Sequence, residues 1–134
     1  MKTPLATALG VALSLLAAGC GGDNKMNVTS RVLKGGKPLT VPENDFVRIQ
    51  FVPYAEPGQN PKTCYIAEYD NAGGTFKALG PDLHGIPPGK YIVTVTHERN
   101  KKDLFKGAYD LPNRPFVFDI DASTREVVID LDKK

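Results

Sequence analysis

The amino-acid sequence predicts an all-β fold, a seven-stranded antiparallel β-sandwich over residues 27–134. Apolar residues in this region mostly alternate with polar ones, which is the period of a half-buried strand. The 13 glycines and 11 prolines fall mainly between the alternating runs, where they end strands and exclude long helices. Two pairs of neighbouring runs also match as hairpins. Together these features favour a small β protein with one core.

The alternating runs define seven expected strands, over residues 27–34, 45–53, 63–69, 75–79, 90–97, 115–121 and 126–131. Side chains alternate along a strand, so every second residue shares a face. In the second strand the apolar face carries Val47, Ile49 and Phe51. In the fifth strand the corresponding face carries Tyr91, Val93 and Val95. These two faces are expected to point into the core.

The third and fourth strands are expected to form a hairpin around a turn at residues 70–74. Tyr65, Ala67 and Tyr69 share one parity, and Phe76 and Ala78 are able to meet them across the turn. Apolar side chains then lie opposite apolar side chains, as a half-buried sheet requires.

The last two strands are expected to form a second hairpin, closed by a loop at residues 122–125. This register sets three apolar pairs opposite one another: Ile120 with Val127, Phe118 with Ile129, and Phe116 with Leu131. A shift by one residue would set Phe118 against Val128 or Asp130, so the apolar pattern favours a single register.

The first 19 residues have the organisation of an export signal. Lys2 precedes an apolar run at residues 5–18, which is shorter than the roughly 20 residues that a membrane span needs. The run ends in Leu16-Ala17-Ala18-Gly19-Cys20, which resembles the bacterial lipobox. This resemblance implies cleavage before Cys20 and acylation of its thiol, and residues 20–26 then form a lipidated, flexible tether. An ordinary signal peptide is the alternative.

The expected location is the bacterial cell envelope, with the domain lipid-anchored outside the cytoplasm. In the sorting rule of well-studied lipoproteins, an Asp after the lipidated Cys favours the inner membrane, and here that position is Gly21. We therefore expect the outer membrane. Seventeen basic and 15 acidic residues give a net charge of +2, which predicts no nucleic-acid partner.

Three segments carry a resemblance to a known family: Gly36-Lys37-Pro38-Leu39, Gly73-Gly74-Thr75-Phe76, and Gly85-Ile86-Pro87-Pro88-Gly89-Lys90-Tyr91. Together they resemble the carboxypeptidase regulatory-like, transthyretin-like β-sandwich domains of small bacterial, planctomycete-type lipoproteins. The resemblance implies a Greek-key sandwich without an active site or cofactor of its own. Independently of the resemblance, the glycines and prolines in these segments are expected to form tight turns and rigid corners of the backbone.

Candidate catalytic residues are few. His84 and His97 are the only histidines, and neither has a metal-ligand spacing beside it. The transthyretin-like fold also includes 5-hydroxyisourate hydrolase, but that family ends in Tyr-Arg-Gly-Ser, whereas this chain ends in Asp-Leu-Asp-Lys-Lys. Cys64 is expected to face outward near a strand start, as an unreactive thiol or an intermolecular disulfide partner. We therefore predict that the protein is not an enzyme.

Two further groups of residues are weaker binding candidates. In the predicted last hairpin four acidic residues gather on the outer side or near the turn, where they would bind calcium or only keep the surface soluble: Asp119, Asp121, Glu126 and Asp130. In the basic segment at residues 98–114, Lys102, Phe105 and Tyr109 would contact a partner, or the aromatic pair would cover the end of the core.

The sequence thus predicts a membrane-tethered β-sandwich module with a structural or interaction role toward envelope proteins or glycans. The alternative function is a binding protein for calcium or glycan, and a hydrolase is a third possibility.

Overall fold

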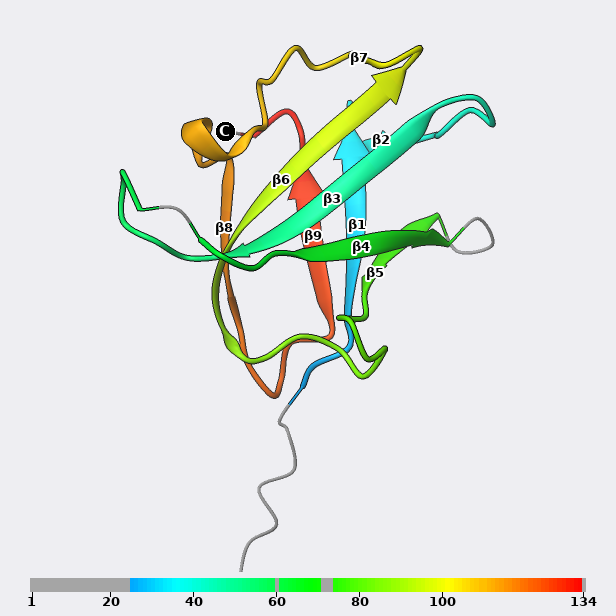
Figure 1. Cartoon of the computed structure of the whole chain (residues 1–134). Coiled ribbons are helices and arrows are strands. Elements are labelled where there is room, and N and C mark those ends of the chain that lie inside the picture. The colour runs from blue at the N-terminus through cyan, green and yellow to red at the C-terminus, as the bar shows by residue number, and fades with distance from the viewer. Residues whose placement is uncertain (1–24, 60, 71–73, 134) are drawn as a thin grey trace, which may run out of the picture.

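The computed structural model describes residues 25–59, 61–70 and 74–133, which form an all-β domain (Figure 1). Its strands are β1 (Val28–Lys34), β2 (Lys37–Pro38), β3 (Phe46–Pro53), β4 (Tyr65–Asp70), β5 (Thr75–Ala78), β6 (Gly89–Arg99), β7 (Lys102–Asp103), β8 (Phe116–Ile120) and β9 (Glu126–Asp130). One short 3-10 helix, η1 (Leu111–Asn113), lies between β7 and β8. All seven predicted strands are present with ends within two residues, and β2 and β7 are short additions.

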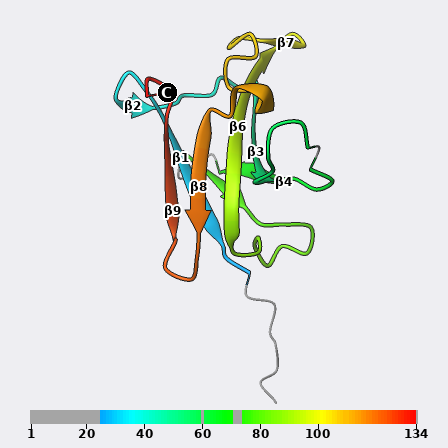
Figure 2. The same ribbon diagram turned by 90° about the vertical axis from the view of Figure 1, so that its left-hand side faces the viewer.

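The strands form one continuous hydrogen-bonded sheet that curls around the core. Its main path runs β2-β1-β5-β4-β3-β6-β7, with β8 added to β6 and β9 added to β1. The two views in Figures 1 and 2 show that the curl brings β3 and β6 across the core from β1 and β9. Every pairing is antiparallel except that of β1 with β9, which is parallel. The all-β prediction is therefore confirmed, whereas the entirely antiparallel pairing is not.

The predicted hairpin of the last two strands is wrong. The turn forms, because Thr124 N–H donates to the Asp121 carbonyl, but β8 pairs with β6 and β9 pairs with β1. Phe118 lies opposite Tyr91 instead of Ile129. The inward-facing positions of these two strands were predicted correctly, since Ile120, Val127 and Ile129 are all buried. Alternation indicates which face is buried, and it leaves open which strand is the neighbour.

The predicted middle hairpin is confirmed in its register. Tyr69 lies opposite Phe76, and Ala67 lies opposite Ala78. The rings of Tyr69 and Phe76 pack with centroids 5.0 Å apart. Residues 71–73 of the predicted turn lie outside the described residues.

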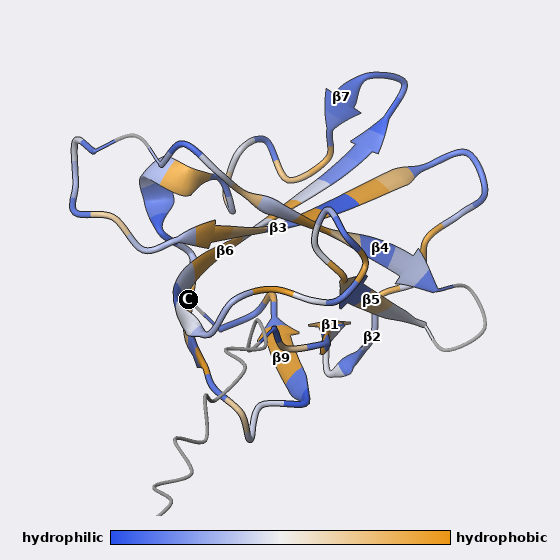
Figure 3. Ribbon diagram, turned by 60° about the horizontal axis from the view of Figure 1, so that its bottom comes forward, coloured by the Kyte–Doolittle hydropathy of each residue, from blue (hydrophilic) through white to orange (hydrophobic). Residues whose placement is uncertain are grey.

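The central pair of strands, β3 and β6, supplies much of the core. Val47, Ile49 and Phe51 are buried as predicted, and Figure 3 shows the resulting apolar stretches in both strands beside the hydrophilic β7. Ile92 and Thr94 are buried as well, although they point to the opposite face of β6. Residues 55–59 and 61–64, together with η1, line two hollows over that face, to which Ile92 and Thr94 also contribute. The outer face of β6 is therefore partly covered.

The predicted Gly-Pro corner holds the start of the domain. Met26 and Ile86 exchange two backbone hydrogen bonds of 2.7 and 3.0 Å. Gly85 fits against this bridge in the positive-φ conformation that favours glycine. Tyr91 then donates its hydroxyl hydrogen to the Pro87 carbonyl at 2.6 Å. Met26 belongs to this bridge and Lys25 forms an ion pair with Asp82, so both residues contact the domain.

The two ends of the domain are distinct. Residues 25–27, the corner at 85–88 and the turn at 121–125 lie at one end, at the bottom of Figure 1. The described C-terminal residues lie at the opposite end, near η1 and β7. We call the first the N-terminal end and the second the distal end.

Candidate functional site

An ionic cluster around the buried carboxylate of Asp45 lies at the distal end, where β3 begins and β6 ends, with Arg99 half exposed. The Asp45 carboxylate accepts hydrogen bonds from Arg99 Nε at 2.7 Å and Arg99 Nη2 at 2.8 Å. His97 Nε2 lies 2.7 Å from Asp45 Oδ2. The Asp45 side chain is only 2 % exposed and that of His97 only 9 % exposed. One carboxylate therefore joins two basic side chains of β6 to the loop before β3.

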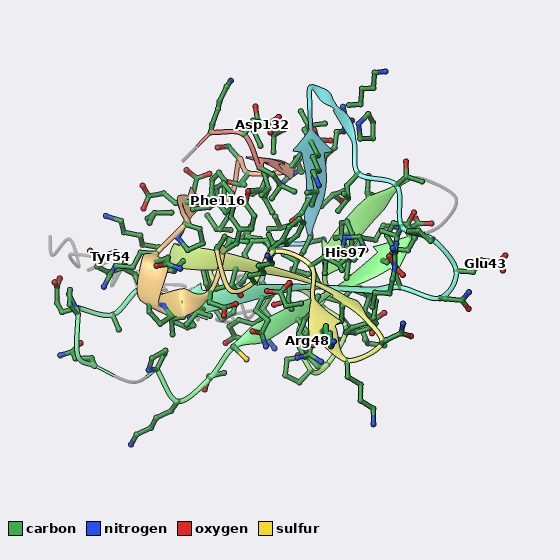
Figure 4. The ribbon with its side chains drawn as sticks, turned by 90° about the horizontal axis from the view of Figure 1, so that it is seen from above. Glu43, Arg48, Tyr54, His97, Phe116 and Asp132 are labelled. Atoms are coloured by element: carbon green, nitrogen blue, oxygen red, sulfur yellow. The ribbon has the colours of Figure 1, made fainter. Side chains whose placement is uncertain are left out.

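Strand pairing explains why these residues meet. Phe46 lies opposite Glu98 in the ladder, so Asp45 is placed beside Arg99. His97 has the same parity as Val93 and Val95 and points to the core side of β6. In Figure 4, His97 and Phe116 lie on one side of β6 and Arg48 on the other.

A second carboxylate supports the cluster from β7. Asp103 accepts backbone hydrogen bonds from Gly107, Phe105 and His97 at 2.7, 3.0 and 3.3 Å. Burial raises the pKa of Asp103, but these backbone donors outweigh it and hold the pKa below the ordinary value. Phe105 packs edge-on against the His97 ring, with centroids 5.7 Å apart. The turn after β7 is thereby fixed over the end of the core.

The electrostatics of the cluster centre on the Asp45 carboxylate. Hydrogen bonds from Arg99, and then from His97, lower the pKa of the Asp45 carboxyl from 3.8 to about 2. Within the described residues, no serine, threonine or cysteine side chain is hydrogen-bonded to His97. The geometry orients an Asp-His-Arg group without presenting a nucleophile to it.

The lowered pKa of Asp45 predicts a pH-dependent stability. Because the folded pKa is about 2 and the ordinary value is 3.8, ionised Asp45 stabilises the fold fully above pH 4. This contribution is lost as the pH falls from about 4 toward 2. The Asp45→Asn variant should therefore be less stable than wild type in urea unfolding at pH 7, and the difference should shrink toward pH 2.

The matched control for this prediction is Glu43→Gln, which changes an exposed acid on the same loop (Figure 4). Its unfolding midpoint should follow that of wild type at every pH. A difference between Asp45→Asn and wild type that stays constant from pH 7 to pH 2 would contradict the assignment.

The other histidine, His84, precedes the start of β6, whereas His97 lies near its end. His84 is exposed in the segment before β6, where its backbone N–H donates to the Asp82 carboxylate at 3.2 Å. His97 lies eight residues after Gly89, the first residue of β6, which at about 3.3 Å per residue places it roughly 26 Å from the start of that strand. The structure does not bring His84 and His97 into one site.

The four acidic residues of the last two strands, which the sequence offered only as weak metal-ligand candidates, are not gathered into one cluster. Asp121 accepts hydrogen bonds from Ser123 and Thr124 within its own turn. Glu126 forms an exposed ion pair with Arg31, and Asp130 pairs with Lys133. Asp119 lies opposite Lys90. Among the described residues, no group of three or more His, Cys, Asp or Glu side chains is placed to hold a metal ion.

The aromatic residues of the basic segment cover the end of the core. Tyr109 is buried and donates its hydroxyl hydrogen to the Leu131 carbonyl at 2.7 Å. It also stacks on Phe116, while Phe105 packs against Tyr109 with centroids 5.0 Å apart. These contacts correspond to the second alternative for the aromatic pair, in which it covers the end of the core. Lys102 is exposed, and a partner contact there stays a prediction.

The sequence did not indicate a groove on the outer face of β3 and β6. Two adjoining hollows of about 400 and 350 Å³ share Pro61, Leu111 and Pro112. We call them together the β3/β6 groove. Its floor consists of Gln50, Val52, Ile92, Thr94 and Thr96. Residues 61–64 form one wall and residues 110–112 the other. Cys64 is exposed as predicted and stands on the first wall.

The predicted signal peptide at residues 1–19 and the lipidated Cys20 lie outside the described residues. Within the part of the chain that is described, no helix has the length and apolar character needed to cross a membrane. Comparisons with protein-family models, curated proteins and solved structures found no match to this chain.

Proposed function

We propose that the chain is an exported bacterial lipoprotein, cleaved before Cys20 and held at a membrane by lipid on that cysteine. The observation that carries the proposal is the segment Leu16-Ala17-Ala18-Gly19-Cys20 directly after an apolar run of signal-peptide length. Two or three acyl chains, at about 0.8 kcal/mol per buried methylene, anchor a protein durably. The domain at residues 25–133 is a non-enzymatic module that contacts other envelope components. The outer membrane is the favoured location.

The contacts of Lys25 and Met26 with the domain support a short tether. Only residues 21–24 separate Cys20 from Lys25, whose ion pair with Asp82 belongs to the domain. Five Cα-to-Cα steps of at most about 3.6 Å hold Lys25 within roughly 18 Å of the lipidated residue. The N-terminal end therefore faces the membrane, and the distal end with the Asp45 cluster faces away from it.

We further propose that the domain is a transthyretin-like sandwich of the carboxypeptidase regulatory-like type. The curled all-β sheet and the corner at Gly85, Ile86 and Pro87 support this finer assignment. Such a module serves as a rigid spacer that presents exposed side chains to partners. Exposed apolar residues toward the distal end include Phe46 and Leu104, which are 52 % and 43 % exposed.

Metabolic labelling with palmitate tests the anchor. Wild type should incorporate label and sediment with membranes, whereas Cys20→Ser should lose both properties because the acylated thiol is gone. Cys64→Ser is the matched control, since it removes the other cysteine of the chain and should keep label and membrane attachment. Continued labelling of Cys20→Ser, or loss of labelling in Cys64→Ser alone, would overturn the proposal.

A further inference from the structure

We propose that the β3/β6 groove binds a neutral oligosaccharide. The groove lies on the domain surface and is independent of the lipid anchor, so the two proposals fail or succeed separately. Its two hollows, of about 400 and 350 Å³, have the size of small-ligand sites.

The hydrogen-bonding groups on the groove floor are uncharged. Gln50 and Thr94 are cross-strand partners, and Thr96 follows on the same face of β6. Hydroxyl and amide groups both donate and accept hydrogen bonds, as sugar hydroxyls do. The floor is the face of two paired strands, whose backbone groups are used in the ladder, so side chains supply the hydrogen bonds here. This arrangement suits a polyhydroxylated ligand better than an extended peptide, which binds through backbone groups at a free sheet edge.

Thr94 is the observation that points to a ligand. The residue is only 5 % exposed, and what remains exposed lines the groove. Across residues 25–59, 61–70 and 74–133, the Thr94 hydroxyl forms no side-chain hydrogen bond. Among the described residues, Ser30 Oγ is the one fully buried side-chain oxygen without a partner, so the exposed part of Thr94 includes its hydroxyl. A ligand hydroxyl in the groove would reach this group and replace the water that solvates it.

The charges around the groove favour a neutral ligand. Its charged lining residues are two acids and two bases: Glu56, Asp110, Lys62 and Arg114. Arg114 is already occupied, because it donates to the Ala55 carbonyl at 2.6 Å and lies over the Tyr54 ring. The groove therefore presents no cationic cluster to a phosphate or an acidic glycan. Val52, Ile92, Leu111 and Pro112 add apolar surface for the carbon face of a sugar ring.

Calorimetric titration of the full-length protein tests the proposal. The protein is purified in a polyoxyethylene detergent, since detergents with sugar headgroups would compete. Maltohexaose, cellohexaose and hexa-N-acetylchitohexaose serve as neutral probes, and hexagalacturonate is the anionic comparison. We expect saturable binding of at least one neutral probe. No saturable binding, or tighter binding of the anionic probe, would overturn the proposal.

Two changes to the groove show where the sugar binds. Thr94→Val keeps the shape but removes the hydroxyl and should raise the Kd about five- to tenfold, whereas Thr29→Val on β1 should leave it unchanged. Alkylation of Cys64 with N-ethylmaleimide should abolish binding, and Cys64→Ser treated in the same way should still bind. An unchanged Kd in both Thr94→Val and the alkylated protein would contradict the proposal, as would saturable binding of an oligoproline peptide without any sugar.

Discussion

Replacing Gly85 with alanine is expected to lower the free energy of unfolding by about 3 kcal/mol or more. A Cβ on Gly85 would lie 2.4 Å from the Met26 carbonyl oxygen and 3.0 Å from the Asn27 nitrogen. These are backbone atoms of the bridge that holds the start of β1, so they cannot rotate away. The φ of 108° adds strain of its own, because L side chains rarely adopt it. Urea unfolding at neutral pH measures the loss.

Gly35→Ala is the matched control for this substitution. Gly35 also has a positive φ, of 60°, but its Cβ would meet no atom within 4 Å. Its variant should lose only about 1 kcal/mol, which is the cost of the left-handed conformation alone. Equal losses in the two variants would show that close packing at the Gly85 corner contributes nothing.

Phe51→Ala should destabilise the protein by about 3–5 kcal/mol, the range for removing a buried phenylalanine from a core. The ring of Phe51 is fully buried and packs edge-on against Tyr91, with centroids 6.1 Å apart. Its removal leaves a cavity in the core that the curled sheet encloses. Chemical denaturation followed by circular dichroism measures the loss.

Phe46→Ala is the matched control, because it removes the same type of side chain from an exposed position on the same strand. Phe46 has the opposite parity and is 52 % exposed, so its variant should differ from wild type by about 0.5 kcal/mol or less. A large loss in Phe46→Ala with a small loss in Phe51→Ala would mean that β3 is shifted by one residue in its register.

The sequence was sufficient to predict the strands and their buried faces. Alternation identified Val47, Ile49 and Phe51 as core residues because burial on one side of a strand imposes a two-residue period. The middle hairpin was predicted in its register because the same alternation sets Tyr69 opposite Phe76 and Ala67 opposite Ala78. In these elements the apolar alternation and the order of the strands along the chain indicate the same structure.

Pairing between distant strands was not predictable from one sequence. The short turn at residues 121–125 suggested a hairpin, but β8 and β9 diverge to opposite ends of the curled sheet. Asp45 was missed as the partner of His97 and Arg99 for a related reason: the ion pair requires β3 to lie beside β6. His97 and Arg99 on one face of β6 were the available signal, but more than one acidic residue was a possible partner.

The β3/β6 groove escaped prediction because its walls come from loops. Leu111 and Pro112 carry no periodic signal, and Thr94 appears in the sequence as an ordinary outward-facing strand residue. Only the packing of residues 61–64 and η1 over the outer face leaves Thr94 5 % exposed at the floor of a groove.

Mass spectrometry of the N-terminal tryptic peptide tests the proposed anchoring most directly. Lys2 and Lys25 are the only trypsin sites in the first 25 residues, so cleavage before Cys20 leaves a six-residue peptide, Cys-Gly-Gly-Asp-Asn-Lys. We predict that this peptide from membrane-purified protein carries a diacylglyceryl group on Cys20, together with an acyl group on the new amino terminus. An unmodified Cys20, in a peptide that still extends back to Thr3 or is cut elsewhere, would contradict the assignment.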